Sequence, residues 1–280
     1  MGSGAIGLVL ARPTRLFGVE PFFMELIAGL EETLAERGLS ILLHVVAARE
    51  AELAAYRRWA EGDVAEAIIV LNITQDDPRP ALLAELGLRA VLVGSWDGEP
   101  DFPVVRADNA GPVRGAVARL VALGHRRIAQ VSGPASLRHT TVRSVALVES
   151  CTAAGVESVV VEGDYTERSG SELTRRLLRS AEPPTAIIYD NDLMALGGLA
   201  AAASLGIDVP AQVSMVAWDD SSLCRLATPP LTVLSIDVHS YGCRVAEAVL
   251  DLLDDRPSVP RWAPTARWIE RASTGPAPMA

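Results

Sequence analysis

Two polar residues stand just after very apolar runs of the sequence. Asn191 lies two positions after the run 186–189, and Asp219 directly follows the run 214–218. Amide and carboxylate groups pair well with hydroxyl groups, and they reject an analogue that would leave them unpaired. Both residues are therefore candidates for binding a small hydroxyl-bearing molecule. Each also has a structural alternative, because asparagine often caps a helix and aspartate often occupies a turn.

Arg143 is a candidate of a different kind, and His139 lies four residues before it. A guanidinium group presents several N–H donors in a fixed fork, which suits vicinal hydroxyls or a phosphate. The alternative is that Arg143 simply faces solvent, as most helical arginines do. His139 is a weaker candidate in the same stretch.

The sequence contains no motif of a known catalytic or cofactor site in the right context. Residues 2–7 match the letters GxGxxG, but these glycines enter a strand, whereas a dinucleotide site needs them between a strand and a helix. Neither GxxxxGK[ST] nor GxSxG occurs. We therefore expect no enzyme, no cofactor and no metal site. The four histidines have no metal-ligand spacing; they are His44, His125, His139 and His239.

The length and charge of the chain limit its function further. With 280 residues, it is longer than one compact core usually needs, so we expect two lobes. The 25 basic and 35 acidic residues give a net charge of −10, and an acidic surface repels phosphate backbones. We expect that this chain does not hold DNA by itself.

The cysteines and the apolar runs of the sequence indicate the cellular compartment of the protein. Cys151, Cys224 and Cys243 are widely spaced and odd in number, which argues against a disulfide framework. The first residues do not resemble a signal peptide, and no run of about 18 apolar residues predicts a membrane span. These features favour a cytoplasmic protein without a membrane segment.

Short apolar runs alternate with amphipathic stretches along the whole chain. This rhythm is typical of parallel α/β sheets covered by helices on both faces, and it starts again near residue 104. In such sheets, ligands bind beyond the carboxyl ends of the strands. The predicted strands are 5–10, 40–46, 67–71, 90–93, 104–105, 128–132, 159–162, 186–189, 214–218, 231–236 and 266–269. The predicted helices are 22–37, 50–59, 80–86, 111–123, 141–154, 169–179, 193–205 and 241–253.

Several segments resemble, in the same order, the LacI/GalR family of transcription regulators. The most specific is 213–221 (VSMVAWDDS) followed by 229–237 (PPLTVLSID), which is similar to the family's VSVVGYDD and PPLTT signature. Together the matches extend over about residues 5–275. The others are 120–129 (LVALGHRRIA), 187–197 (IIYDNDLMALG), 21–23 (PFF), 133–134 (GP) and 273–274 (ST).

The resemblance implies a fold like that of the periplasmic binding proteins. Two doubly wound lobes would be joined by three crossovers, with the effector in the cleft between them. The first lobe would be 5–104 with 238–262, and the second 105–237 with 263–275. In the family, a DNA-binding helix-turn-helix headpiece precedes the point where this chain begins.

The resemblance also implies which residues contact the effector. It places Arg143, Asn191 and Asp219 at positions that bind effector hydroxyls. The further implied contacts are Phe22, Phe23, Trp96, His139, Tyr165 and Asp237.

Several of these contacts have structural alternatives. Phe22 and Phe23 would cover the apolar face of a sugar ring, or pack in the core. Trp96 is favoured as a cleft residue over a packing residue. Tyr165 could instead be a half-buried tyrosine at a strand end, and Asp237 could support a hinge.

The chain departs from the family pattern in places that change the polarity of the cleft. The turn 12–20 is longer than the common form, carries Glu20 where asparagine is frequent, and contains two arginines that would favour a charged effector. Ser95 stands where an acidic residue is common, and Ile236 where a polar one is common. The identity of the effector therefore cannot be copied from a relative.

The expected function is that of a homodimeric cytoplasmic repressor's sensing domain. A sugar or related polyol would shift the angle between the lobes and so change operator binding by the headpieces. Two alternatives stay open: a solute-binding protein of an ABC transporter, which shares the fold, and a sugar-modifying α/β enzyme.

Overall fold

The computed structural model describes residues 4–11, 21–96 and 101–279, and the chain forms two compact units. Unit 1 comprises Met1–Asp108 and Asp237–Pro264, and unit 2 comprises Asn109–Ile236 and Thr265–Ala280. These bounds differ by a few residues from those of the predicted lobes. The unusual turn 12–20 and Gly2, the first glycine of the GxGxxG-like letters, lie outside the described residues.

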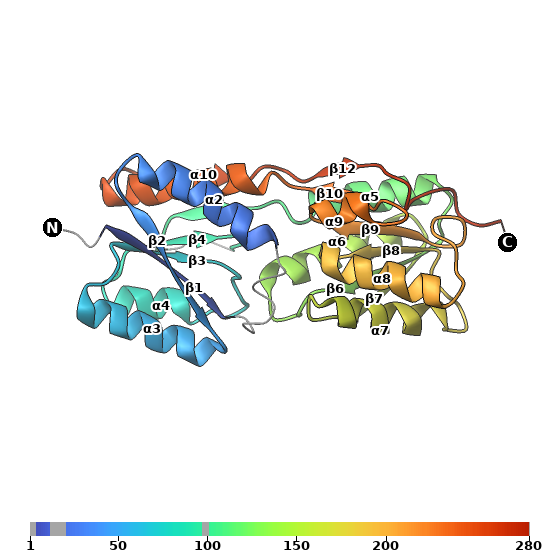
Figure 1. The fold of residues 1–280 in the computed structure, drawn as a ribbon, viewed down its shortest axis with the longest axis horizontal. Coiled ribbons are helices and arrows are strands. Elements are labelled where there is room, and N and C mark those ends of the chain that lie inside the picture. The colour runs from blue at the N-terminus through green and yellow to red at the C-terminus, as the bar shows by residue number, and fades with distance from the viewer. Residues whose placement is uncertain (1–3, 12–20, 97–100, 280) are drawn as a thin grey trace. The chain divides into compact units, whose positions relative to one another are not determined.

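Unit 1 is a six-stranded sheet between two pairs of helices (Figure 1). Its strand order is β11-β5-β4-β3-β1-β2, and all of its pairings are parallel. Helices α2 and α10 lie on one face of this sheet, and α3 and α4 lie on the other. The strands are β1 (Ala5–Ala11), β2 (Ser40–Val46), β3 (Ala67–Val70), β4 (Ala90–Val93), β5 (Val104–Arg106) and β11 (Arg261–Trp262). The helices are α2 (Pro21–Ala35), α3 (Arg49–Gly62), α4 (Arg79–Glu85) and α10 (Val238–Leu253).

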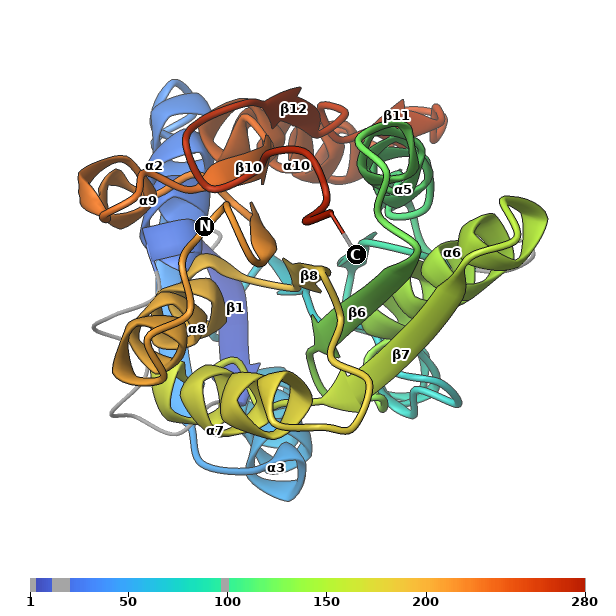
Figure 2. The ribbon, with the colours of Figure 1, turned by 90° about the vertical axis from the view of Figure 1, so that its right-hand side faces the viewer.

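Unit 2 repeats this plan with the strand order β12-β10-β9-β8-β6-β7. Helices α7 and α8 cover one face of the sheet, and α5 and α6 cover the other (Figure 2). The strands are β6 (Arg127–Ser132), β7 (Glu157–Glu162), β8 (Ala186–Tyr189), β9 (Ser214–Trp218), β10 (Thr232–Ser235) and β12 (Arg267–Ile269). The helices are α5 (Gly111–Ala122), α6 (Arg138–Ala153), α7 (Glu167–Leu178), α8 (Asp192–Ser204) and α9 (Ser222–Leu226).

The predicted fold class of two doubly wound parallel-sheet lobes is confirmed. Both sheets reverse their strand order at one place, between β1 and β3 in unit 1 and between β6 and β8 in unit 2. Such a switch point leaves a crevice at the carboxyl ends of the two strands, where ligands of this fold class bind. Among the strands that the structure describes, the edge strand β12 alone departs from the parallel pattern and pairs antiparallel with β10.

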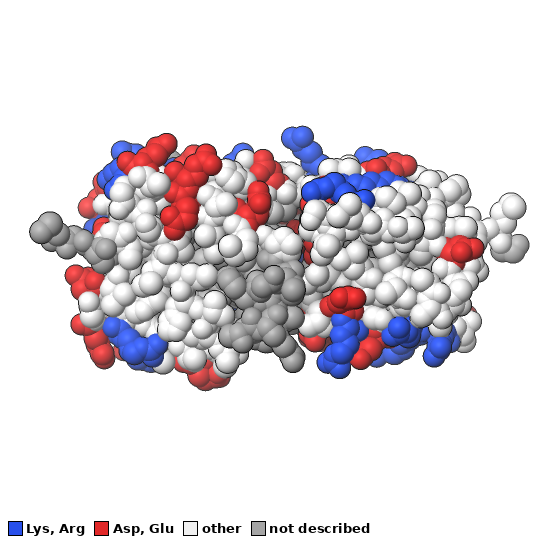
Figure 3. All heavy atoms as spheres, in the orientation of Figure 1, with Lys and Arg blue, Asp and Glu red and all other residues white. Residues whose placement is uncertain are grey.

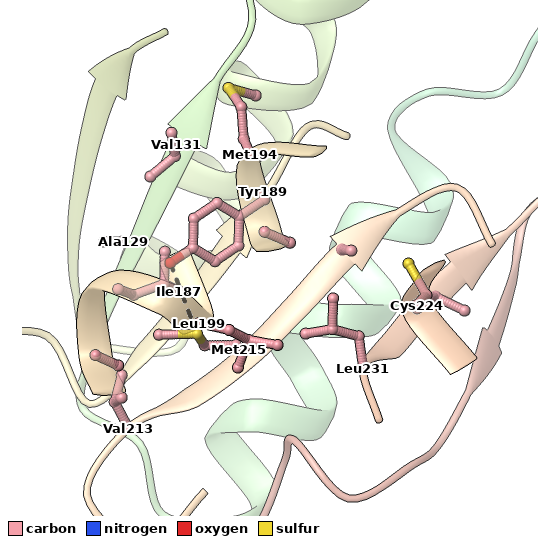
Figure 4. Close-up of a cluster of buried hydrophobic side chains, with 14 of the residues drawn as sticks. Ala129, Val131, Ile187, Tyr189, Met194, Leu199, Val213, Met215, Cys224 and Leu231 are labelled. Atoms are coloured by element: carbon pink, nitrogen blue, oxygen red, sulfur yellow. Dashed lines mark hydrogen bonds between the residues drawn. The ribbon is translucent and has the colours of Figure 1, made fainter. Parts of the chain in front are cut away.

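Each face of the unit 2 sheet has its own hydrophobic core. Beneath α7 and α8, Tyr189 lies among aliphatic side chains and its hydroxyl points toward Met215 Sδ, 3.8 Å away (Figure 4). Burial raises the pKa of Tyr189, and its hydroxyl also pairs with Thr174 Oγ1 at 2.8 Å. The central strands of unit 2 carry apolar residues on both faces because helices cover both faces of the sheet. They therefore appear in the sequence as continuous apolar runs.

A buried ionic network fixes the loop that leaves the carboxyl end of β3. The guanidinium of Arg79 is 2% exposed and pairs with Glu52 at 2.8 Å and with Asp77 at 2.6 Å. It also donates to the carbonyl oxygens of Leu71 and Asn72, at 2.8 and 3.0 Å. Every charge in the network is therefore paired, as burial requires.

Among the helices that the structure describes, none is both long and apolar enough to cross a membrane.

Candidate functional site

The carboxyl ends of β6 and β8 are tied together by the carboxylate of Asp190. Its Oδ1 accepts a hydrogen bond from Gln130 Nε2 on β6 at 2.7 Å, and its Oδ2 accepts one from the backbone N–H of Gly133 at 3.1 Å. Burial raises the pKa of Asp190, and the positive charge of Arg143 opposes this shift. These contacts hold the two loops of the switch point in a fixed arrangement.

Arg143 lies against this switch point from helix α6 and is anchored on three sides. Its Nε donates to Asn109 Oδ1 at 3.0 Å, and its Nη1 donates to the backbone oxygen of Asp190 at 3.1 Å. Its Cζ lies over the Trp218 ring, 3.5 Å from the ring centroid. Arg143 is only 8% exposed, and its Nη2 makes no hydrogen bond to the residues that the structure describes. The side chain is therefore rigid, and it still has N–H groups to offer.

Asn191 caps helix α8, as the structural alternative predicted. Its Oδ1 accepts from the backbone N–H of Met194 at 2.9 Å, and its Nδ2 donates to the backbone oxygen of Tyr165 at 3.0 Å. An amide has two N–H donors and two acceptor lone pairs, so one of each remains after these two bonds. Capping and ligand binding are thus compatible at this position.

Asp219 lies at the carboxyl end of β9 in an unusual backbone conformation. Its φ is +72°, in the left-handed region that aspartate tolerates better than most residues. The backbone N–H of Asp219 donates to Leu234 O of β10 at 3.1 Å. Asp219 is half-buried and directly follows Trp218, the residue on which Arg143 is stacked.

The polar groups of Tyr165 and His139 are engaged mainly with each other and with neighbouring residues of the protein. The Tyr165 hydroxyl is 2.8 Å from His139 Nε2 and 3.0 Å from Thr140 Oγ1, and the two rings are stacked. Tyr165 is only 5% exposed, and its ring fills the space that a side chain at Gly133 would need. Tyr165 therefore shapes the loop after β6 more than it presents a ring face to solvent.

The predicted contacts of unit 1 lie at the ends of strands or helices. Phe23 is buried in the core, whereas its neighbour Phe22 is half-buried and meets it edge-on, with ring centroids 5.5 Å apart. Trp96, after β4, is half-buried beside the core cluster under α3 and α4, and its carbonyl accepts from Arg106 Nη1 at 2.6 Å. Asp237 caps α10 through Ser240, which lowers the pKa of Asp237.

The structure brings Arg143, Asn191 and Asp219 to one edge of the unit 2 sheet, where strands β8 and β9 end. Sequence reasoning missed their supports, which are Asn109, Gln130, Asp190 and Trp218. One signal was available for Gln130, which is a polar residue inside the apolar strand 127–132. A buried amide in a strand needs a polar partner, and here that partner is Asp190.

Known proteins share both the sequence pattern and this fold. A family model described as a periplasmic binding protein-like domain matches residues 117–274. The HTH-type transcriptional regulator CelR of Thermobifida fusca is 31% identical over 260 residues, which cover 91% of this chain and 76% of that protein.

Two solved structures are similar over nearly the whole chain. A LacI family transcriptional regulator from Bifidobacterium animalis has a TM-score of 0.91 at 33% identity and covers 99% of this chain and 100% of its own. A complex of the transcriptional regulator CelR with cellobiose has a TM-score of 0.89 at 29% identity, covering 97% of this chain and 85% of its own. The chain therefore belongs to the LacI family of transcriptional regulators and carries the effector domain of that family.

Proposed function

We propose that this domain senses a sugar or a related polyol, which binds in a cleft between the two units. The observation that carries the proposal is the arrangement around Arg143. A buried, stacked guanidinium with N–H groups to spare lies at the switch point of unit 2, beside Asn191 and close along the chain to Asp219. The relative CelR, which binds cellobiose, supports a sugar as the effector class.

The mixture of donors and acceptors favours a neutral polyol over a phosphorylated one. A hydroxyl group both donates and accepts, so it can satisfy the Arg143 N–H groups and the Asp219 carboxylate at once. A phosphate would accept from Arg143 but would be repelled by Asp219. Phe22 and Trp96 are proposed to cover the apolar face of the sugar ring from unit 1.

The proposed response is a change in the relation of the two units. A ligand that contacts both units binds most tightly to one arrangement, so it raises the population of that arrangement. In the intact regulator, a homodimer would pass this change to the helix-turn-helix headpieces on operator DNA. The role is that of a sensor, in keeping with relatives that are transcriptional regulators, and no catalytic step is proposed.

The experiment is a thermal-shift screen of the purified chain with sugars, including cellobiose, sugar alcohols, sugar phosphates and nucleosides. A site ligand at about 100 times its Kd should stabilise the folded chain by about 2.7 kcal/mol. Small-angle scattering with the strongest hit should then show a changed radius of gyration. A screen in which only phosphorylated compounds stabilise the chain would contradict the proposal.

Asp219→Asn tests the site with a small change of shape. We expect it to remove most of the thermal shift produced by the strongest hit. Both oxygens of the carboxylate can accept hydrogen bonds from ligand hydroxyls, whereas an amide can accept only through its single oxygen. Asp63→Asn is the matched control, since Asp63 also has a positive φ, of 49°, but caps the far end of α3. An equal response in both variants would refute the assignment of Asp219.

A further inference from the structure

Helices α2 and α10 of unit 1 bring together three side chains that can bind a metal ion. A carboxylate oxygen of Glu32, a ring nitrogen of His239 and the Sγ of Cys243 all lie within 4.8 Å of one another. His239 Nε2 is 3.0 Å from Glu32 Oε2, and His239 Nδ1 is 3.8 Å from Cys243 Sγ. We propose that Glu32, His239 and Cys243 form a binding site for Zn²⁺ or a similar thiophilic divalent cation.

The donor set and its spacing fit zinc. Zn²⁺ is borderline-soft and takes thiolate, imidazole and carboxylate ligands, often three from the protein with a water in the fourth position. With metal–ligand bonds of about 2.0–2.3 Å, neighbouring donors of a tetrahedral site are roughly 3.5 Å apart. In the structure, Glu32 and Cys243 contact different nitrogens of the His239 ring, at 3.0 and 3.8 Å. With one ligand atom from each residue, the three donors lie within 4.8 Å of one another, so side-chain rotations must bring them about 1 Å closer to close the site.

The backbone holds the three ligands on a rigid frame. His239 and Cys243 are four residues apart on α10, so they share one face of the helix. The two helices touch at glycines: a Cβ on Gly29 would lie 2.0 Å from His239 O, and a Cβ on Gly242 would lie 2.2 Å from Leu26 O. This close approach of the helices accompanies the 3.0 Å contact between Glu32 of α2 and His239 of α10. The helices therefore position the ligands before any metal binds.

The site is open to a metal from solvent. Glu32 is 70% exposed and His239 35% exposed, and acidic side chains gather over α2 and α10 on the face shown in Figure 3. The other two cysteines, Cys151 and Cys224, are buried in unit 2. Any thiolate–metal signal from the folded chain should therefore come from Cys243.

The test uses Co²⁺ as a spectroscopic substitute for Zn²⁺ on the full chain. We expect a thiolate-to-cobalt absorption band at one Co²⁺ per chain, and its loss when Zn²⁺ is added. Cys243→Ser and His239→Gln should abolish the band, and Glu32→Gln should weaken Co²⁺ binding at least about tenfold. Glu36→Gln, at an exposed carboxylate just past the end of α2, should leave it unchanged. A band that persists in Cys243→Ser, or no band in the wild type, would overturn the proposal.

A second readout does not depend on the folding of a cysteine variant. In the wild type, Zn²⁺ should slow the alkylation of Cys243 by iodoacetamide, because a metal-bound thiolate is a poorer nucleophile. Glu32→Gln should reduce this protection, and Glu36→Gln should keep it. Equal alkylation rates with and without Zn²⁺ would contradict the site.

Discussion

The guanidinium of Arg143 is stacked on the indole of Trp218, with Cζ 3.5 Å from the ring centroid. Trp218 is the last residue of β9, and Asp219 follows it. Arg143 comes from α6, on a different part of the chain. The contact therefore joins the two proposed effector contacts through one aromatic ring.

Replacing this ring should weaken effector binding even though Trp218 itself offers no group to the ligand. Trp218→Leu removes the cation–π contact, which is one of the three contacts that hold Arg143 in place, so more of its side-chain freedom must be lost when the ligand binds, and we expect an affinity loss of about tenfold, or about 1.4 kcal/mol. Isothermal titration with the strongest hit of the screen measures it. Trp262→Leu, at an exposed tryptophan of unit 1, is the control and should bind as the wild type does.

Asp190→Asn should test the buried carboxylate of the switch point. An asparagine can accept from Gly133 and donate to Gln130 Oε1, a buried atom without a hydrogen-bond partner among the described residues. We expect the unfolding free energy at pH 7 to change by no more than about 1 kcal/mol. Chemical denaturation provides this value.

The stability difference between the wild type and Asp190→Asn should depend on pH, because the pKa of Asp190 is raised in the folded chain. A carboxyl whose pKa is raised on folding favours the folded state below its unfolded pKa of about 3.9, and this gain is lost as the pH rises through the folded pKa. The wild type should therefore lose stability relative to Asp190→Asn as the pH rises above about 4. A difference that does not vary with pH would show that the carboxylate is as well solvated as in the unfolded chain.

The contribution of Asp77 to stability should change with pH in the opposite direction to that of Asp190. Burial alone would raise the pKa of Asp77, but the hydrogen bonds and charge of Arg79 outweigh it and hold this pKa at about 2. The resulting stabilisation is present above the unfolded pKa and is lost as the pH falls through about 2. Asp77→Asn should cost about 2–3 kcal/mol of unfolding free energy at pH 7. Asp76→Asn, at the exposed neighbour, should cost less than about 0.5 kcal/mol.

Two helical glycines should respond to alanine in opposite directions. A Cβ on Gly170 would lie 2.2 Å from Met194 O, where α7 crosses α8, so Gly170→Ala should destabilise unit 2 by about 1–3 kcal/mol. A Cβ on Gly115 of α5 would meet nothing within 4 Å, so Gly115→Ala should stabilise it by about 0.5–1 kcal/mol. Thermal unfolding of both variants checks the pair, and equal effects would mean that helix packing does not decide them.

Most of the fold was predictable because buried parallel strands are apolar throughout and helices have a period of 3.6 residues. The predicted strand 186–189 coincides with β8, and the predicted helix 241–253 lies inside α10. The elements that were missed are short: β11 has two residues and α9 has five. The antiparallel direction of β12 depends on how the chain returns to the sheet edge, which no local pattern records.

The candidate site was predictable only in part. Asn191 and Asp219 could be placed because strand ends are visible as the ends of apolar runs. The stacking of Arg143 on Trp218 joins residues 75 positions apart, and only the folded chain reveals it. The cluster of Glu32, His239 and Cys243 was missed because Glu32 comes from a distant helix, and the four-residue spacing of His239 and Cys243 does not by itself indicate a metal site.

The most direct test of the proposed function is a crystal structure of the chain with the strongest sugar from the screen. We predict density for the sugar at the carboxyl ends of β8 and β9, with its hydroxyls within hydrogen-bond distance of Arg143, Asn191 and Asp219. Density for the sugar at any place where it touches none of these three side chains would contradict the account.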